Sequence, residues 1–128
     1  MAKHNEPRFS IGVDFGTNSV RALVVDVADG SEVGSAVFNY PSGQDGILLD
    51  PKEPNLARQN PADYMEGFRR AVAGAVRAAK RADGFEPSRV VGIGIDATGS
   101  TPLPVDRAGV PLAMKARFAK NLAAQAWL

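Results

Sequence analysis

The stretch of the sequence with the clearest chemical potential is Asp14-Phe-Gly-Thr-Asn-Ser-Val-Arg21. Gly16 permits a tight turn that exposes successive backbone N–H groups, and the three polar residues after it add side-chain donors. Converging donors of this kind suit the oxygens of a phosphate group. The Asp14 carboxylate, just before the turn, could hold a hydrated Mg²⁺ ion, which prefers oxygen ligands. The spacing predicts a phosphate-binding turn, and an ordinary hairpin turn explains it equally well.

A second unusual stretch runs from Gly92 to Thr101 and reads Gly-Ile-Gly-Ile-Asp-Ala-Thr-Gly-Ser-Thr. It contains the letters of a dinucleotide-binding fingerprint, in which a glycine turn opens a helix. Here the glycines lie inside an apolar run, and Pro102 and Pro104 follow in place of a helix, so we reject that match. The small polar residues beyond Asp96 instead predict one wall of a cleft, with hydroxyls and backbone amides.

The composition excludes several other kinds of site. The 128 residues include no cysteine and a single histidine, His4, which excludes thiolate zinc sites, cysteine nucleophiles and multi-histidine metal sites. The 15 Lys and Arg against 14 Asp and Glu give a net charge of +1, without the basic footprint of a nucleic-acid or membrane-surface protein. No apolar run has the length of a membrane span or a signal peptide. The sequence therefore predicts a soluble, cytoplasmic protein.

Strands and one helix are expected to hold the two stretches in place. Alternating apolar residues predict a strand over 9–14, a strongly apolar run predicts one over 20–27, and apolar residues among small ones predict a third over 32–40. Short turns would join them into an antiparallel meander. Asn60 and Pro61 have the residue types of a helix cap and first turn, and they precede one apolar stripe. A short apolar strand over 90–95 follows that helix.

The remaining segments carry weaker patterns. Residues 41–61 contain four prolines and no period, which predicts a long loop. Residues 102–112 are predicted as a hairpin, residues 117–128 as a helix, and residues 1–8 as a flexible tail. The predicted order is β-β-β-α-β-(β-β)-α, an α/β fold of the ribonuclease H-like or actin-like ATPase class.

The two chemical stretches together resemble a known family. The stretch 14–21 resembles the first phosphate motif of the FGGY carbohydrate kinases, within the sugar kinase, Hsp70 and actin superfamily. Gly92 to Pro102 narrows the resemblance to the L-ribulokinase branch, as do Asn60-Pro-Ala-Asp-Tyr64 and Pro104-Val-Asp-Arg-Ala-Gly109. The resemblance covers residues 9–128, which look like the amino-terminal part of the first actin-like kinase domain.

This resemblance implies ATP-dependent phosphorylation of L-ribulose to L-ribulose 5-phosphate in L-arabinose breakdown, with ATP and Mg²⁺ as cofactors. Carried over residue by residue, it implies a metal ligand, Asp14, acting through water; the phosphate ligands Gly16, Thr17, Asn18 and Ser19; and the sugar ligands Thr98, Gly99 and Ser100. The expected partners are small molecules, with no nucleic acid or membrane, and a homodimer is compatible with the full-length form.

The resemblance also implies that part of the family's machinery lies outside this chain. The family's general base belongs to a later segment of its pattern, and we expect it beyond Leu128, together with the adenine pocket. No catalytic residue is therefore expected within the chain, which should be inactive alone.

Three alternatives remain open from the sequence. Another FGGY sugar kinase, of the ribulose or xylulose type, would carry similar motifs. A ribonuclease H-like Mg²⁺-dependent nuclease would use carboxylates on the first strand, the helix and the fourth strand, here Asp14, Glu66 and Asp96. A non-catalytic segment that supports only folding or assembly is the third.

Overall fold

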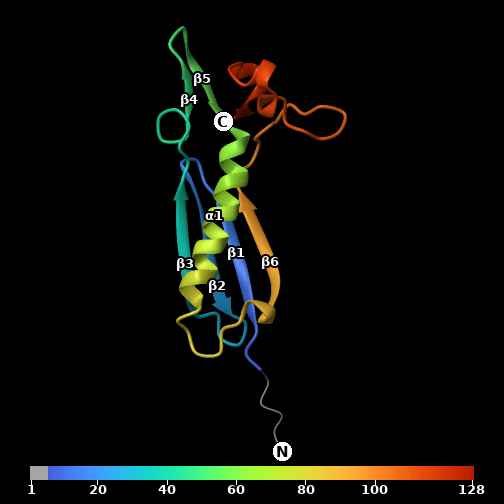
Figure 1. Cartoon of the computed structure of the whole chain (residues 1–128). Helices are drawn as coiled ribbons and strands as arrows, with labels where there is room; N and C mark the ends of the chain where they lie inside the picture. Colours follow the sequence, from blue (N-terminus) through green and yellow to red (C-terminus); the bar gives the residue numbers. More distant parts are fainter. Residues whose placement is uncertain (1–5) are drawn as a thin grey trace, which may run out of the picture.

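Residues 6–128 are described here by a computed structural model of the chain (Figure 1). The predicted tail over residues 1–8, with His4, falls mostly outside the described residues. The strands are β1 (Phe9–Phe15), β2 (Ser19–Asp26), β3 (Glu32–Asn39), β4 (Leu48–Asp50), β5 (Glu53–Gln59), β6 (Val90–Ala97) and β7 (Ala126–Trp127). The helices are α1 (Pro61–Ala79) and the short 3₁₀ turns η1 (Pro87–Arg89), η2 (Leu112–Met114), η3 (Ala116–Phe118) and η4 (Leu122–Ala124).

A four-stranded sheet in the order β3-β2-β1-β6 forms the body of the structure. β1, β2 and β3 pair antiparallel, and β6 returns after α1 to pair parallel with β1. In this register Ile11 lies between Val24 on β2 and Ile93 on β6. The predicted meander, and the predicted strand over 90–95 joining the same sheet, are therefore confirmed.

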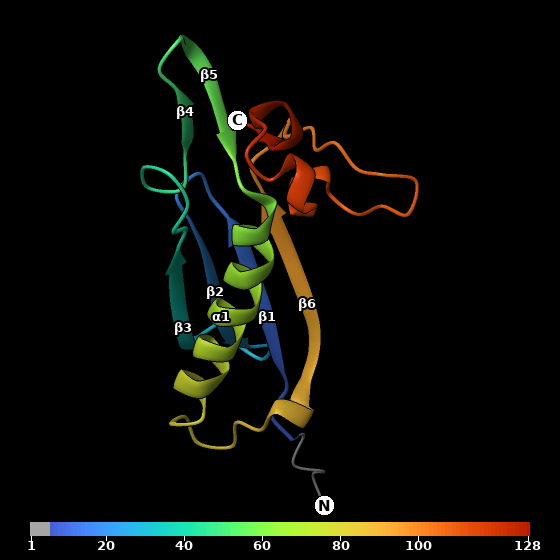
Figure 2. The same cartoon turned by 45° about the horizontal axis from the view of Figure 1, so that its top comes forward.

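Helix α1 covers one face of this sheet, where it packs mainly on β2 and β3 (Figures 1 and 2). The Asn60 side chain accepts a hydrogen bond from the Ala62 amide at 3.0 Å, which confirms the predicted helix start. The buried residues between helix and sheet are Phe9, Ile11, Val13, Val20, Ala22, Val24, Ala71, Ala75 and Ala79. Within residues 6–128 no helix is both long and apolar enough to cross a membrane.

Gly34 on β3 lets the helix approach the sheet closely, and we expect Gly34→Ala to destabilise the fold. A Cβ atom at this position would lie 2.4 Å from the Ala79 nitrogen and 2.6 Å from the Ala75 carbonyl oxygen. Both are backbone atoms of α1, so the whole helix must shift to admit a methyl group. Overpacking of this kind costs about 1–3 kcal/mol, and we expect the upper part of that range in the free energy of unfolding, measured by denaturant titration.

Gly92→Ala is the matched control for this prediction. Gly92 also lies in a strand, and a Cβ atom there would meet nothing within 4 Å. Alanine at such a site reduces the freedom of the unfolded chain without a clash, so stability should be unchanged or slightly higher. Equal effects of the two substitutions would contradict the close approach at Gly34.

The prediction of a long loop over 41–61 is wrong in its second half. Residues 48–59 form the hairpin β4–β5, in which Leu48 pairs with Arg58 and Leu49 with Ala57. β4 has three residues, too few to show a period, and Pro51 lies in the connecting turn. β5 in turn pairs with β7 near the other end of the described chain, a long-range contact that no local pattern contains.

The predicted hairpin over 102–112 is only partly correct. The Asp106 amide donates to Val110 and the Gly109 amide to Asp106, so the turn is present. The flanking strands are absent from the described structure except for one isolated bridge, between Val105 and Pro111. Prolines at 102, 104 and 111 remove the N–H donors that a ladder needs.

The predicted helix from Arg117 to Leu128 is wrong. This segment folds as the 3₁₀ turns η3 and η4 followed by β7, and Leu128 lies after that strand, 46% exposed. Trp127 donates its amide to the Pro102 carbonyl at 3.0 Å, and the Arg58 guanidinium lies over its ring at 4.3 Å. A helix of this length is marginal by itself, so these tertiary contacts determine the local structure.

Candidate functional site

The candidate phosphate turn connects β1 to β2. The Gly16 amide donates to the Ser19 carbonyl at 2.9 Å and closes the turn. A Cβ atom on Gly16 would lie 3.3 Å from that same oxygen, so the turn is tight enough to favour glycine. The sequence therefore forms a compact loop between two strands, as predicted from the spacing.

Two backbone donors of this turn are free to bind a ligand. Within the described residues, the N–H groups of Thr17 and Asn18 donate to no group of the chain. Ser19 is half-buried at the start of β2, and Asn18 is exposed. Adjacent free amides at an exposed turn are the donor set that an anion such as phosphate requires.

The other groups of the turn are engaged in holding it. The Asn18 side chain donates to the Asp45 carbonyl at 2.7 Å, and the Asn18 carbonyl accepts from the Tyr40 amide at 3.0 Å. Asp45 has a φ of 51°, in the left-handed region, so the loop after β3 bends sharply to make this contact. The Asn18 side chain is therefore occupied in holding the loop, and the group of Asn18 that can bind a phosphate is its backbone amide.

Asp14 lies on the sheet face opposite α1, with a second carboxylate beside it. It pairs with Arg21 on β2 and with Asp96 on β6, and all three are exposed. They line a hollow of about 350 Å³ whose floor includes Gly12 and Gly94. The Asp96 Oδ1 atom accepts from the Ala97 amide at 2.9 Å. Two solvent-facing carboxylates suit a hydrated divalent cation, so the residues present fit Mg²⁺.

Residues 98–100 lie beside the phosphate turn. The Thr98 amide donates to the Phe15 carbonyl at 3.1 Å, which ties the end of β6 to the end of β1. All three residues are exposed, and Ser100 has a φ of 58° in the left-handed region. The structure thus brings the two chemical stretches of the sequence together at one edge of the sheet.

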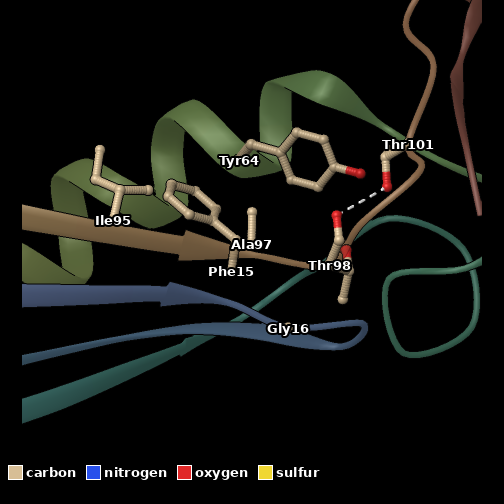
Figure 3. A pocket seen from close by; sticks show the side chains of 7 residues that line it. All are labelled: Phe15, Gly16, Tyr64, Ile95, Ala97, Thr98 and Thr101. Carbon is tan, nitrogen blue, oxygen red and sulfur yellow. Dashed lines mark hydrogen bonds between the residues drawn. The ribbon is translucent and has the colours of Figure 1, made fainter.

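An apolar hollow of about 270 Å³ opens between this edge and the start of α1 (Figure 3). Its lining residues are Phe15, Gly16, Tyr64, Ile95, Ala97, Thr98 and Thr101. The Thr101 hydroxyl donates to the Thr98 carbonyl at 3.4 Å across its rim. Thr98 therefore contributes to this hollow, whereas Gly99 and Ser100 lie beyond it.

Two aromatic hydroxyls behind the turn stay protonated well above neutral pH. Burial raises the pKa of Tyr64 to about 12, and the nearby Asp63 carboxylate adds to the effect. Burial likewise raises the pKa of Tyr40 to about 12, with Tyr64 and Asp63 as further causes. Both side chains are therefore neutral, and Tyr64 can act as a hydrogen-bond donor at any working pH.

The three-carboxylate arrangement of a nuclease is not assembled. Glu66 lies on α1 and pairs with Arg69 and Arg70, both at 2.7 Å, whereas Asp14 and Asp96 face the other side of the sheet. These arginines also hold the pKa of the Glu66 carboxyl below its usual value. Among residues 6–128 no three His, Asp or Glu side chains are grouped to hold a metal ion. The nuclease alternative, which needs Asp14, Glu66 and Asp96 side by side, is therefore wrong for the described structure.

Sequence reasoning missed one residue of this region, Gln59. Its amide bonds both to the Thr17 carbonyl and to the Tyr64 hydroxyl. It falls in the segment predicted as a loop, where a buried polar side chain is not expected. The only signal in the sequence was the position of Gln59 directly before the helix cap Asn60, where the chain enters α1.

No family model matches the chain. Over 115 residues, or 87% of its length, it is 42% identical to the ribulokinase of Geobacillus thermodenitrificans, and over 125 residues it is 42% identical to that of Mycolicibacterium smegmatis. Among solved structures, the gluconate kinase of Lactobacillus acidophilus matches 80% of the chain with a TM-score of 0.60 and 16% identity. The chain spans about a fifth of the length of each of these relatives. The resemblance to ribulokinases is confirmed, and the α/β fold with a mixed sheet is similar to the matching part of the gluconate kinase.

Proposed function

We propose that this chain forms the phosphate-binding part of an ATP-dependent ribulokinase, an FGGY sugar kinase that converts L-ribulose to L-ribulose 5-phosphate. The observation that carries the proposal is the pair of free amides on the turn after β1, next to the exposed Asp14 carboxylate. The 42% identity to ribulokinases supports L-ribulose as the sugar. Because ATP is the phosphate donor, the proposal implies action in the cytoplasm.

Each side of the site has a distinct role in this proposal. The Thr17 and Asn18 amides, with the Ser19 hydroxyl, bind the phosphates of ATP. Asp14 orients the water around Mg²⁺, and the ion, when bound, offsets the charge of the phosphates. The segment from Thr98 to Ser100 contacts the sugar through hydroxyls and backbone groups, since Gly99 has no side chain.

The 128-residue chain alone is expected to be inactive in phosphoryl transfer. The reaction depends on positioning and charge stabilisation by groups that surround the phosphate. Here the candidate groups lie at one exposed end of the four-stranded sheet, where β1 and β6 end and β2 begins, and they approach a ligand from one side. The groups on the other side of the phosphate would have to come from the remaining four-fifths of a full-length ribulokinase, with which this chain does not align. A general base and an adenine pocket beyond Leu128 therefore stay a prediction.

A chimera tests this proposal directly. We expect that the Geobacillus thermodenitrificans ribulokinase, with its matching 115-residue segment replaced by this chain, phosphorylates L-ribulose with ATP and Mg²⁺. The isolated chain serves as the negative control, and D-xylulose, D-gluconate and glycerol are the competing substrates. A folded chimera without kinase activity would refute the proposed phosphate-binding role. A preference for another of these sugars would favour a different FGGY kinase.

A further inference from the structure

The carbonyl group of Thr17, on the phosphate turn, is held by a buried side chain from another part of the chain. Gln59, the last residue of β5, is 1% exposed and lies 42 residues further along the sequence. Its Nε2 atom donates to the Thr17 carbonyl, and its Oε1 atom accepts from the Tyr64 hydroxyl at 2.6 Å. The turn is therefore anchored to the junction of β5 and α1.

The orientation of the Gln59 amide is fixed by its two partners. The Thr17 carbonyl can only accept a hydrogen bond, so it must face the NH₂ group. The Tyr64 hydroxyl has one proton to donate, and it keeps that proton because burial raises its pKa to about 12. The Tyr64 ring is itself packed edge-on against Phe15 and Tyr40, with ring centroids 6.2 and 5.7 Å apart. Both ends of the amide are thus held by groups that cannot easily turn away.

Holding the Thr17 carbonyl also orients the next amide. The Thr17 C=O and the Asn18 N–H belong to one planar peptide unit, and in a trans peptide they point in opposite directions. Because Gln59 draws the carbonyl toward the protein interior, the Asn18 N–H must point outward. That N–H is one of the two free donors of the turn.

We propose that Gln59 is a positioning residue of the phosphate turn: its hydrogen bond to Thr17 keeps the Asn18 N–H directed at a bound phosphate. Tyr64 acts one step further away, because it orients Gln59. Neither side chain touches the nucleotide in this arrangement. The inference rests on the proposed function for the identity of the ligand, and on the described contacts for the geometry.

Gln59→Leu and Tyr64→Phe test this role in the 128-residue chain. Leucine keeps most of the volume of Gln59 and removes both hydrogen bonds, and phenylalanine removes one hydroxyl. We measure the affinity for a fluorescent ATP analogue with Mg²⁺, and the hydrogen exchange of segment 15–20 by mass spectrometry at micromolar concentration. Both measurements are made well below the melting temperature, and the exchange of α1 in the same spectra shows how much of any change comes from a loss of overall stability.

Gln59→Leu should bind the analogue roughly tenfold more weakly, because, of the two lost hydrogen bonds, the one to Thr17 orients the turn, and should exchange segment 15–20 faster. Tyr64→Phe should change both in the same direction, and the double variant should resemble Gln59→Leu. The matched control is Gln125→Leu. Gln125 is also buried, at 3% exposed, and its Nε2 atom donates to the Ala119 carbonyl at 2.9 Å and not to a group of the turn.

The outcomes separate this inference from the proposed function. Unchanged exchange and unchanged affinity in Gln59→Leu would overturn the positioning role. If the parent chain bound no ATP analogue while Gln59→Leu still accelerated exchange, the positioning of the turn would stand and the phosphate ligand would be wrong. If Gln59→Leu did not fold, Tyr64→Phe would decide by the same two measurements.

Discussion

Replacing Asp14 by alanine in the chimera is expected to lower the turnover of L-ribulose phosphorylation by roughly a hundredfold, the upper end of the usual loss when a group that orients a metal's surroundings is removed. Asp14 is exposed at the end of β1 and, within the described residues, forms no hydrogen bond or ion pair through its side chain. Its removal should therefore leave the free energy of unfolding almost unchanged. Turnover is measured as a function of Mg²⁺ concentration.

Two further variants make this result specific. Asp14→Asn keeps the size of the side chain and removes its charge, so we expect most of the loss to remain. Asp83→Ala removes an exposed aspartate in the turn after α1, at the opposite end of the sheet from the phosphate turn (Figure 2), and should have no effect. Turnover of Asp14→Ala equal to that of the parent at limiting Mg²⁺ would show that Asp14 has no metal role.

The parts of the fold that could be predicted are those whose pattern is local. Apolar residues alternate along β1, as in Phe9, Ile11 and Val13, and the structure buries all three beneath α1. The helix start could be recognised from Asn60 because a cap depends on its immediate neighbours alone. The local sequence of β1 and of the start of α1 already favours the observed conformation, and packing in the core stabilises it further.

The parts that could not be predicted depend on distant partners. β5 acquires its strand conformation by pairing with β4 and with Ala126 and Trp127 of β7, and neither pairing leaves a period in the sequence. The segment after Arg117 has helical spacing, but the contacts of Trp127 with Pro102 and Arg58 favour another path. In both cases a tertiary contact outweighs a weak local preference.

The candidate site divides in the same way. The turn around Gly16 could be predicted because the residues that form it are consecutive. Its support could not, since Gln59 and Tyr64 reach the turn from the far side of the 41–61 segment. The neighbouring position of Asp14 and Asp96 follows only from the register of β1 and β6. Sequence reasoning thus identifies the ligand-facing groups more readily than the groups that hold them.

β6 carries an exposed apolar stripe, formed by Val91, Ile93 and Ile95. These side chains are 59%, 53% and 65% exposed, although Ile93 and Ile95 lie beside the buried Ile11 and Val13 of β1. Helix α1 packs on β2 and β3 and leaves β6 uncovered, as Figure 2 shows. β6 is also the last strand of its sheet, so one row of its backbone groups is unpaired. One side of β6 is therefore left without a covering element in the described structure.

We expect the isolated 128-residue chain to self-associate through this stripe. Exposed apolar surface contributes about 25 cal/mol per Å² when it is buried, and an edge strand adds unpaired hydrogen-bonding groups. Association should rise with protein concentration in analytical ultracentrifugation, together with binding of a dye that recognises exposed apolar surface. Replacing both isoleucines, as Ile93→Lys with Ile95→Lys, should abolish most of the association and of the dye binding.

The control for this last prediction must add the same charge elsewhere. Val37→Lys with Leu49→Lys also replaces two exposed apolar residues, 52% and 55% exposed, on β3 and β4. Each double variant adds two positive charges to a chain of net charge +1, so general repulsion between molecules rises equally in both. If association depends on the stripe, only the β6 variant becomes monomeric. A parent chain that stays monomeric and unfolds in one cooperative step would contradict the prediction, because β6 would then need no cover.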